Sequence, residues 1–230
     1  FCGQLREVDM SFKRMVHNNS LVITLFGIFF ATIIGMSIAG WVNNNETLAA
    51  HSQPTETYIE FIASGEFIEG VFENWESEFL QMWALIILTV FLRQKGSADS
   101  KPIRGKTPQD TRPRYRLSNA EDWTHRLTAV RHTVYSHSLG LAMLALFILS
   151  FSLHAAGGTA AYNEENVAHG EDKVSVGTYV TTPRFWYESL QNWQSEFLAV
   201  GTLLVLSIKL RERGSPQSKP VGARYDHETG

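Results

Sequence analysis

A run of 22 residues without a charged side chain constrains this chain more than any other feature. The run, residues 21–42, reads LVITLFGIFFATIIGMSIAGWV. A helix rises about 1.5 Å per residue, so this length covers the roughly 30 Å hydrocarbon core of a bilayer. Lys13 and Arg14 precede the run, as in a signal peptide, but the run exceeds the about 7 to 15 apolar residues of a signal core. It therefore predicts a transmembrane helix.

Three more apolar stretches follow, at 79–92, 139–156 and 197–210. Two of them have only 14 residues, about 21 Å of helix, which is too short to cross the bilayer. Apolar residues at helical spacing precede the first of these, so we expect a continuous helix from about Glu66 to Arg93. The chain then has four spans, at about residues 21–42, 67–92, 135–156 and 185–210.

The two halves of the chain are copies of each other. A shift of 118 residues pairs residues 17–103 with 135–221 without a gap, and 24 of the 87 pairs are identical. NWESEFL at 74–80 thus returns as NWQSEFL at 192–198. The duplication predicts an all-α membrane protein with four transmembrane helices, built from two parallel two-helix repeats that a pseudo-twofold axis along the membrane normal relates.

The remaining segments flank and connect these repeats. The division is a cytoplasmic N-terminal segment 1–16, repeat 1 at 17–103, a basic linker at 104–134, repeat 2 at 135–221 and a cytoplasmic tail at 222–230. Ser118 and Glu121 form a capping-box pattern in the linker and predict an interfacial helix on the inner leaflet. Eighteen of the twenty Lys and Arg residues lie before the first span, between the second and third spans, or at and beyond the end of the fourth, so both termini are expected in the cytoplasm.

Two blocks carry a resemblance to a known family. They are FENWESEFLQMWALIILTVFLRQKGSADSK at 72–101 and YNEENVAHG at 162–170. Both resemble an uncharacterised family of small bacterial integral membrane proteins, known as a domain of unknown function. The resemblance implies a multi-pass protein of the bacterial inner (plasma) membrane and implies no activity. The second copy departs from the motif at Gln194 and Ala199, where the first has Glu76 and Gln81.

A polar stripe on the second helix of each repeat is the candidate site. Asn74, Ser77, Glu78 and Gln81 share one helical face, and intramembrane carboxylates are usually functional. Across the pseudo-twofold, Glu78 could face Glu196 and bind a cation or a proton. The candidate ion or proton residues are Glu78, Glu196, Asn74, Asn192, Ser77 and Ser195. In the alternative interpretation the helix breaks near Phe72, and Asn74 caps its first turn.

The other chemical candidates are weaker. Glu46, His51, Glu164 and His169 supply metal-ligand types, but their spacing is not a recognised pattern and favours turn and capping contacts. His154 pairs with Met36 in the repeat, so a haem with paired histidines is not expected, nor is any other cofactor. We find no catalytic triad pattern. Basic residues at the inner ends predict contacts with lipid headgroups: Arg93, Lys95, Lys101, Arg126, Arg131, Arg211, Arg213 and Lys219.

Small residues in the first span, Gly27, Ala31 and Gly35 among them, suit close helix packing and a homo-oligomer. The first functional hypothesis is accordingly a non-enzymatic structural or accessory membrane component that associates with itself or with a larger membrane complex. The second is a small proton or cation transporter or channel that uses Glu78 and Glu196. The third is a lipid-acting membrane enzyme. Membrane lipids are expected partners and nucleic acid is not.

Overall fold

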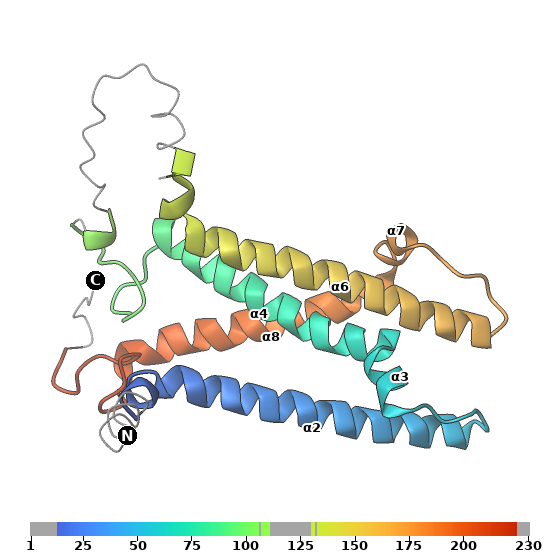
Figure 1. Cartoon of the computed structure of the whole chain (residues 1–230). Coiled ribbons are helices and arrows are strands. Elements are labelled where there is room, and N and C mark those ends of the chain that lie inside the picture. Colours follow the sequence, from blue (N-terminus) through green and yellow to red (C-terminus); the bar gives the residue numbers. More distant parts are fainter. Residues whose placement is uncertain (1–12, 106, 111–129, 132, 225–230) are drawn as a thin grey trace. The chain divides into compact units, whose positions relative to one another are not determined.

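The computed structural model describes residues 13–105, 107–110, 130–131 and 133–224, and every regular element in them is a helix. The chain is therefore all-α, as predicted. The interfacial helix predicted in the linker, with Arg126, lies outside the described residues. The elements are α2 (Ser20–Ala50), α3 (Tyr58–Ile62), α4 (Gly65–Phe91), η1 (Pro108–Asp110), α6 (Ser138–Ala168), α7 (Val176–Tyr179) and α8 (Pro183–Lys209). Figure 1 shows them in chain order.

Two of these helices, α2 and α6, are long and apolar enough to cross a membrane. Each has 31 residues, about 46 Å of helix, and so extends beyond a hydrocarbon core of roughly 30 Å. The helix α4 is continuous over 27 residues, as the length argument requires. The alternative in which the helix breaks near Phe72 is wrong, because Asn74 lies inside α4 and does not cap it.

The contacts divide the chain into two compact units, with the boundary between Phe67 and Ile68. In the first unit, α2 holds the segment that follows it. Asn45 brackets Glu56, because its side-chain oxygen accepts the Glu56 N–H at 2.7 Å and its amide donates to the Glu56 carbonyl at 2.9 Å. Trp41 donates to the same carbonyl, and Ser37 bonds the Tyr58 hydroxyl at 2.7 Å. These contacts turn the chain back along α2.

The second unit repeats the same local design 118 residues later. Asn163 brackets Val174 with bonds of 2.7 and 3.0 Å, as Asn45 brackets Glu56. Ser175 caps the short helix α7, in the way that Thr57 caps α3. Because these contacts are local in sequence, residues at equivalent positions form them independently in each copy.

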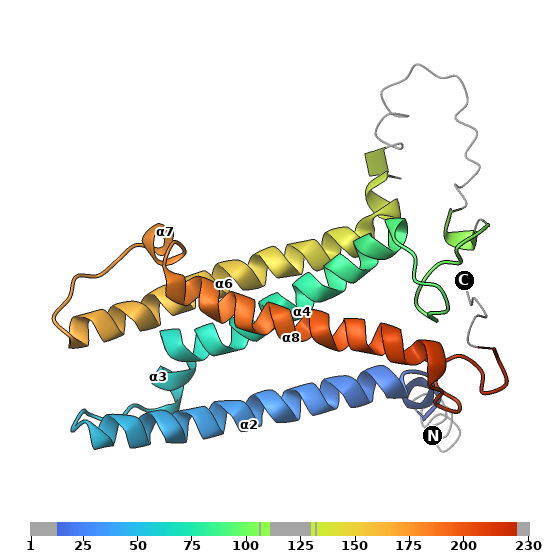
Figure 2. The same ribbon diagram turned by 180° about the vertical axis from the view of Figure 1, so that it is seen from behind.

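Three long helices pack together in the second unit (Figures 1 and 2). Phe151 of α6 packs edge-on against Phe185 of α8, with ring centroids 5.3 Å apart. At the other end of α6, a side chain at Gly140 would meet Ile87 of α4. The short helix α7 lies against α6 through Tyr162 and Tyr179. The three helices therefore surround the residues near the start of α8, and α7 packs beside them.

A glycine in a left-handed conformation follows the last helix of each repeat. Gly96 and Gly214 have φ values of 80° and 88°, and they lie several residues beyond Phe91 and Lys209. Each is the third residue of a tight turn, because Ser97 N–H bonds the Gln94 carbonyl and Ser215 N–H bonds the Glu212 carbonyl.

Candidate functional site

The most deeply buried polar contact of the second unit joins α6 to α4. His154 and Glu76 both have side chains that are 0% exposed, and Nδ1 of His154 lies 2.7 Å from Oε2 of Glu76. The imidazole also stacks on Phe185 of α8, with centroids 4.9 Å apart. The second oxygen of Glu76 accepts a bond of 2.8 Å from the indole N–H of Trp193. Both oxygens of this carboxylate are therefore hydrogen-bonded.

The opposite nitrogen of His154 is buried and makes no hydrogen bond to the described residues. It lies 3.9 Å from Oε2 of Glu188 on α8, which is too long for a hydrogen bond. A buried ring nitrogen without a partner is costly, because it has lost its hydration. This nitrogen marks a place that a proton or a ligand could occupy.

Two more carboxylates meet at Tyr179, beside that nitrogen. The hydroxyl of Tyr179 lies 2.9 Å from Oε1 of Glu69 and 2.9 Å from Oε2 of Glu188. Burial, followed by the charge of Glu69, raises the pKa of Tyr179 well above its usual range, so the phenol keeps its proton. A phenol has one hydrogen to donate. It cannot satisfy two carboxylates fully at the same time.

These residues form one group, which we call the His154 cluster: Glu69, Glu76, His154, Tyr179, Arg184 and Glu188. The His154 cluster has more acidic than basic side chains. Arg184 donates from Nε to Oε1 of Glu188 at 2.9 Å, and its other end binds the more exposed Glu165. Within the His154 cluster, Arg184 is the one permanent cation against three carboxylates. Such an excess in a buried place requires protons or a bound cation.

All six predicted ion or proton residues lie outside the His154 cluster. Glu78 is exposed and Glu196 is half-buried, and their charges interact. Asn74, Ser77 and Ser195 each donate to a carbonyl of their own helix. Asn192 is the exception, because it donates to Glu73 of α4 at 2.6 Å. The stripe thus stays a prediction, and the buried carboxylate of the NWESEFL motif is Glu76.

The weak metal candidates His51 and His169 form local hydrogen bonds at the ends of α2 and α6. Nδ1 of His51 bonds the Thr47 carbonyl, and Nδ1 of His169 bonds the Glu165 carbonyl, both at 2.8 Å. Both histidines are exposed, and so are Glu46 and Glu164.

The basic residues predicted to bind headgroups fall into two groups. Arg93, Lys95, Arg131 and Arg213 are exposed. The others contact the protein: Lys101 binds Asp110, Arg211 donates to carbonyls that include Ala223, and Lys219 is buried. The Lys101 ammonium and Thr107 hold the pKa of Asp110 well below its usual range.

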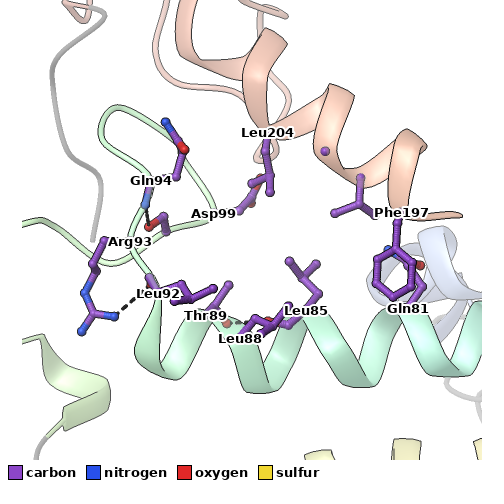
Figure 3. A pocket seen from close by; sticks show the side chains of 13 residues that line it. Gln81, Leu85, Leu88, Thr89, Leu92, Arg93, Gln94, Asp99, Phe197 and Leu204 are labelled. Atoms are coloured by element: carbon purple, nitrogen blue, oxygen red, sulfur yellow. Dashed lines mark hydrogen bonds between the residues drawn. The ribbon is translucent and has the colours of Figure 1, made fainter. Parts of the chain in front are cut away.

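A groove between α4 and α8 opens beside Arg93. It has a volume of about 310 Å³, and Figure 3 shows Leu85 and Leu88 of α4 facing Phe197 and Leu204 of α8 across it. Its walls are apolar, while polar groups such as Gln94 and Asp99 stand at one end. This is the form of a site for a hydrocarbon chain with a polar head.

The residues of the His154 cluster differ between the two copies of the repeat. His154, Glu69, Tyr179 and Glu188 correspond in the other copy to Met36, Tyr187, Phe61 and Gly70. The predicted polar stripe consists of residues that both copies keep, whereas the His154 cluster uses residues that only one copy has. An ionisable residue in an apolar helix without a counterpart would have revealed it.

No curated protein and no solved structure matches this chain. A family model described as a domain of unknown function, DUF6766, matches residues 12–230. The match covers nearly the whole chain, including both copies of the repeat and every residue of the His154 cluster. The chain therefore belongs to the DUF6766 family, whose function is unknown.

Proposed function

We propose that this chain is a multi-pass membrane protein that takes a cation into the His154 cluster and passes it along the bundle of α4, α6 and α8. The observation that carries the proposal is the contact between two fully buried side chains, Glu76 and His154, in a cluster whose carboxylates outnumber its permanent cation. Charged groups inside membrane proteins commonly mark ion or proton pathways.

Further polar side chains lead away from the cluster. Ser77 and Gln81 of α4 are buried, and so is Ser150 of α6, one turn from His154. Gln81 also lines the groove of Figure 3, which ends at Thr89, Arg93 and Asp99 near the inner end of α4. These buried polar side chains support movement of a cation from the His154 cluster as far as Gln81, where the groove begins.

The proposal includes the topology expected from the sequence. Four spans α2, α4, α6 and α8, in two repeats related by a pseudo-twofold axis, place both termini in the cytoplasm of a bacterial cell. The matching element order of the two copies supports this arrangement, since α6, α7 and α8 begin 118 residues after α2, α3 and α4. The exposed Arg93 and Arg213 would then contact headgroups, and a lipid chain fits the groove.

Flux through liposomes tests the transport step. The full chain is reconstituted with a pH-sensitive dye or a divalent-ion indicator inside, and ion gradients are applied. Glu76→Gln should reduce flux at least about tenfold, because it removes one buried charge. The second copy already has Gln194 at this position, so glutamine suits the helix. Glu78→Gln is the matched control, because Glu78 is exposed on the same helix.

Two outcomes would overturn the transport proposal. One is wild-type flux no greater than that of empty liposomes. The other is full flux in Glu76→Gln together with loss in the double variant Glu78→Gln, Glu196→Gln, which would move the path to the polar stripe.

Self-association is a second candidate function, and α2 favours it. Its apolar side chains are largely exposed in the structure, among them Phe26, Phe30 and Ile34. A side chain added at Gly27 or Gly35 would meet nothing within 4 Å. The face of α2 that carries these two glycines therefore leaves room for another helix. Crosslinking in native membranes through a cysteine at Gly35 would test it, with a cysteine at Phe26 as the comparison.

A further inference from the structure

We infer that the His154 cluster binds one divalent transition-metal ion, with Nε2 of His154 and a carboxylate oxygen from each of Glu69 and Glu188 as ligands. The inference deepens the proposed function, because it names the cation that the cluster holds. It rests on the distances between these three ligand atoms, which movement of a cation does not require.

The three ligand atoms are already close together. One atom from each of Glu69, His154 and Glu188 lies within 4.8 Å of the other two. The pair formed by His154 and Glu188 is 3.9 Å apart. In a tetrahedral site with bonds of about 2.1 Å, ligand atoms are about 3.4 Å apart. Small side-chain rotations would therefore complete the site.

The imidazole of His154 is oriented as metal-binding histidines are. Its Nδ1 contacts the carboxylate of Glu76 at 2.7 Å, and Glu76 is fixed in turn by Trp193. When Nδ1 carries the hydrogen for this bond, Nε2 presents its lone pair on the opposite side. Nε2 is the buried nitrogen that has no hydrogen bond to the described residues. A metal-bound histidine usually binds the metal through one ring nitrogen and donates the N–H of the other nitrogen to a carboxylate or a carbonyl.

The carboxylate ligands also have supporting contacts. Arg184 holds Oε1 of Glu188, which leaves Oε2 facing His154. The Tyr179 hydroxyl lies 2.9 Å from Oε1 of Glu69 and 2.9 Å from Oε2 of Glu188, and it can donate its hydrogen to either carboxylate. Gly158 keeps the space open, since an added Cβ would lie 2.6 Å from Oε1 of Glu69 and 2.5 Å from the Tyr179 hydroxyl.

The charges of the cluster favour a divalent ion. When its three carboxylates are ionised, they outnumber the single charge of Arg184 by two, and a divalent ion would bring the sum to zero. A single proton on His154 would leave one negative charge unbalanced. One imidazole nitrogen with carboxylate oxygens suits zinc, iron or manganese, whereas magnesium and calcium prefer oxygen ligands alone.

Metal binding to the full chain in detergent tests the inference. After a chelator has removed bound metal, Co²⁺ is titrated while its visible absorption is followed, and the bound Zn²⁺ is counted by elemental analysis. We expect one ion per chain. His154→Met should abolish this binding, and methionine fits because the repeat has Met36 there. Glu76→Gln should weaken the affinity by about 10- to 100-fold, because it removes the orienting carboxylate.

Two matched controls should leave the binding unchanged. His169→Ala removes an exposed histidine, and Glu78→Gln removes an exposed carboxylate of α4. Circular dichroism of each variant shows whether the helices are kept. The metal site is overturned when folded wild-type protein binds no stoichiometric ion, or when His154→Met binds it as tightly as wild type.

These results separate the two proposals. Stoichiometric metal without flux supports the site and removes the transport function. Proton flux by metal-free protein that binds no Co²⁺ or Zn²⁺ supports transport and removes the metal site.

Discussion

Nδ1 of His154 and Oε2 of Glu76 are 2.7 Å apart and 78 residues apart in the chain, and neither side chain is exposed. This contact fixes α6 against α4 at the depth where Trp193 of α8 also reaches Glu76. Both groups lose their hydration when they are buried, and their hydrogen bond offsets part of this cost. Removing one partner therefore leaves the other buried without compensation.

Removing one partner of the buried pair should destabilise the fold. Glu76→Ala leaves His154 without its bond and should cost about 3 to 5 kcal/mol of unfolding free energy. The loss is measured by thermal unfolding in detergent. The double variant Glu76→Gln, His154→Met should lose less than the sum of its single variants. Strictly additive losses would show that the pair has no energetic coupling.

Trp193→Phe should lower stability through one hydrogen bond. The phenyl ring keeps contact with Phe147, whose centroid lies 6.3 Å from that of Trp193, but Oε1 of Glu76 loses its donor. A buried charged acceptor without a partner costs about 1 to 3 kcal/mol. Trp186→Phe is the control, since Trp186 is 42% exposed. Equal losses in both variants would contradict the role of the indole N–H.

Gly158→Ala should be destabilising although alanine favours helices. Its Cβ would lie within 2.6 Å of both Glu69 and Tyr179, and such overpacking costs typically about 1 to 3 kcal/mol. Gly201→Ala makes the same change on α8, where nothing lies within 4 Å. That control should be neutral or stabilising by up to about 1 kcal/mol. The two melting temperatures, compared with wild type, decide the matter.

The asparagine brackets should act locally and alike in both copies. Asn45→Ala removes both bonds to Glu56, and Asn163→Ala removes both bonds to Val174. Each change should speed hydrogen exchange of the amide it frees, with little effect in the other copy. Asn43→Ala is the control, because that residue is exposed. Protection that survives in both bracket variants would refute the role of these side chains.

The N-terminus of α3 should respond to acid. The backbone N–H and hydroxyl of Thr57 donate to Glu60, and they hold the pKa of Glu60 below its ordinary 4.5. The charged form is therefore favoured in the fold. Its contribution is present above about pH 4.5 and is lost as the pH falls through the lower folded pKa. NMR titration of Glu60 should show this midpoint. Thr57→Ala keeps the backbone N–H and removes the hydroxyl, so it should move the midpoint part of the way up towards 4.5. An unchanged midpoint would contradict the role of the hydroxyl.

The sequence alone determined the helices and the repeated turns. Apolar runs such as 21–42 and the required span length indicated α2 and the continuous α4, because helix formation depends on neighbouring residues. Asn45 and Asn163 occupy equivalent positions in the two copies, and each forms its local bonds within its own loop. These features depend on residues that are close in the sequence and not on the tertiary packing of the helices.

Only the tertiary structure decided which polar face of α4 is buried. Glu76 and Glu78 lie two residues apart and therefore point about 160° away from each other around the helix. Either face could have been covered, and the repeat drew attention to Glu78 because both copies keep it. The choice of Glu76 depends on His154 and Trp193, which lie 78 and 117 residues away. Helical periodicity defines faces, but the partner that covers a face is set by long-range packing.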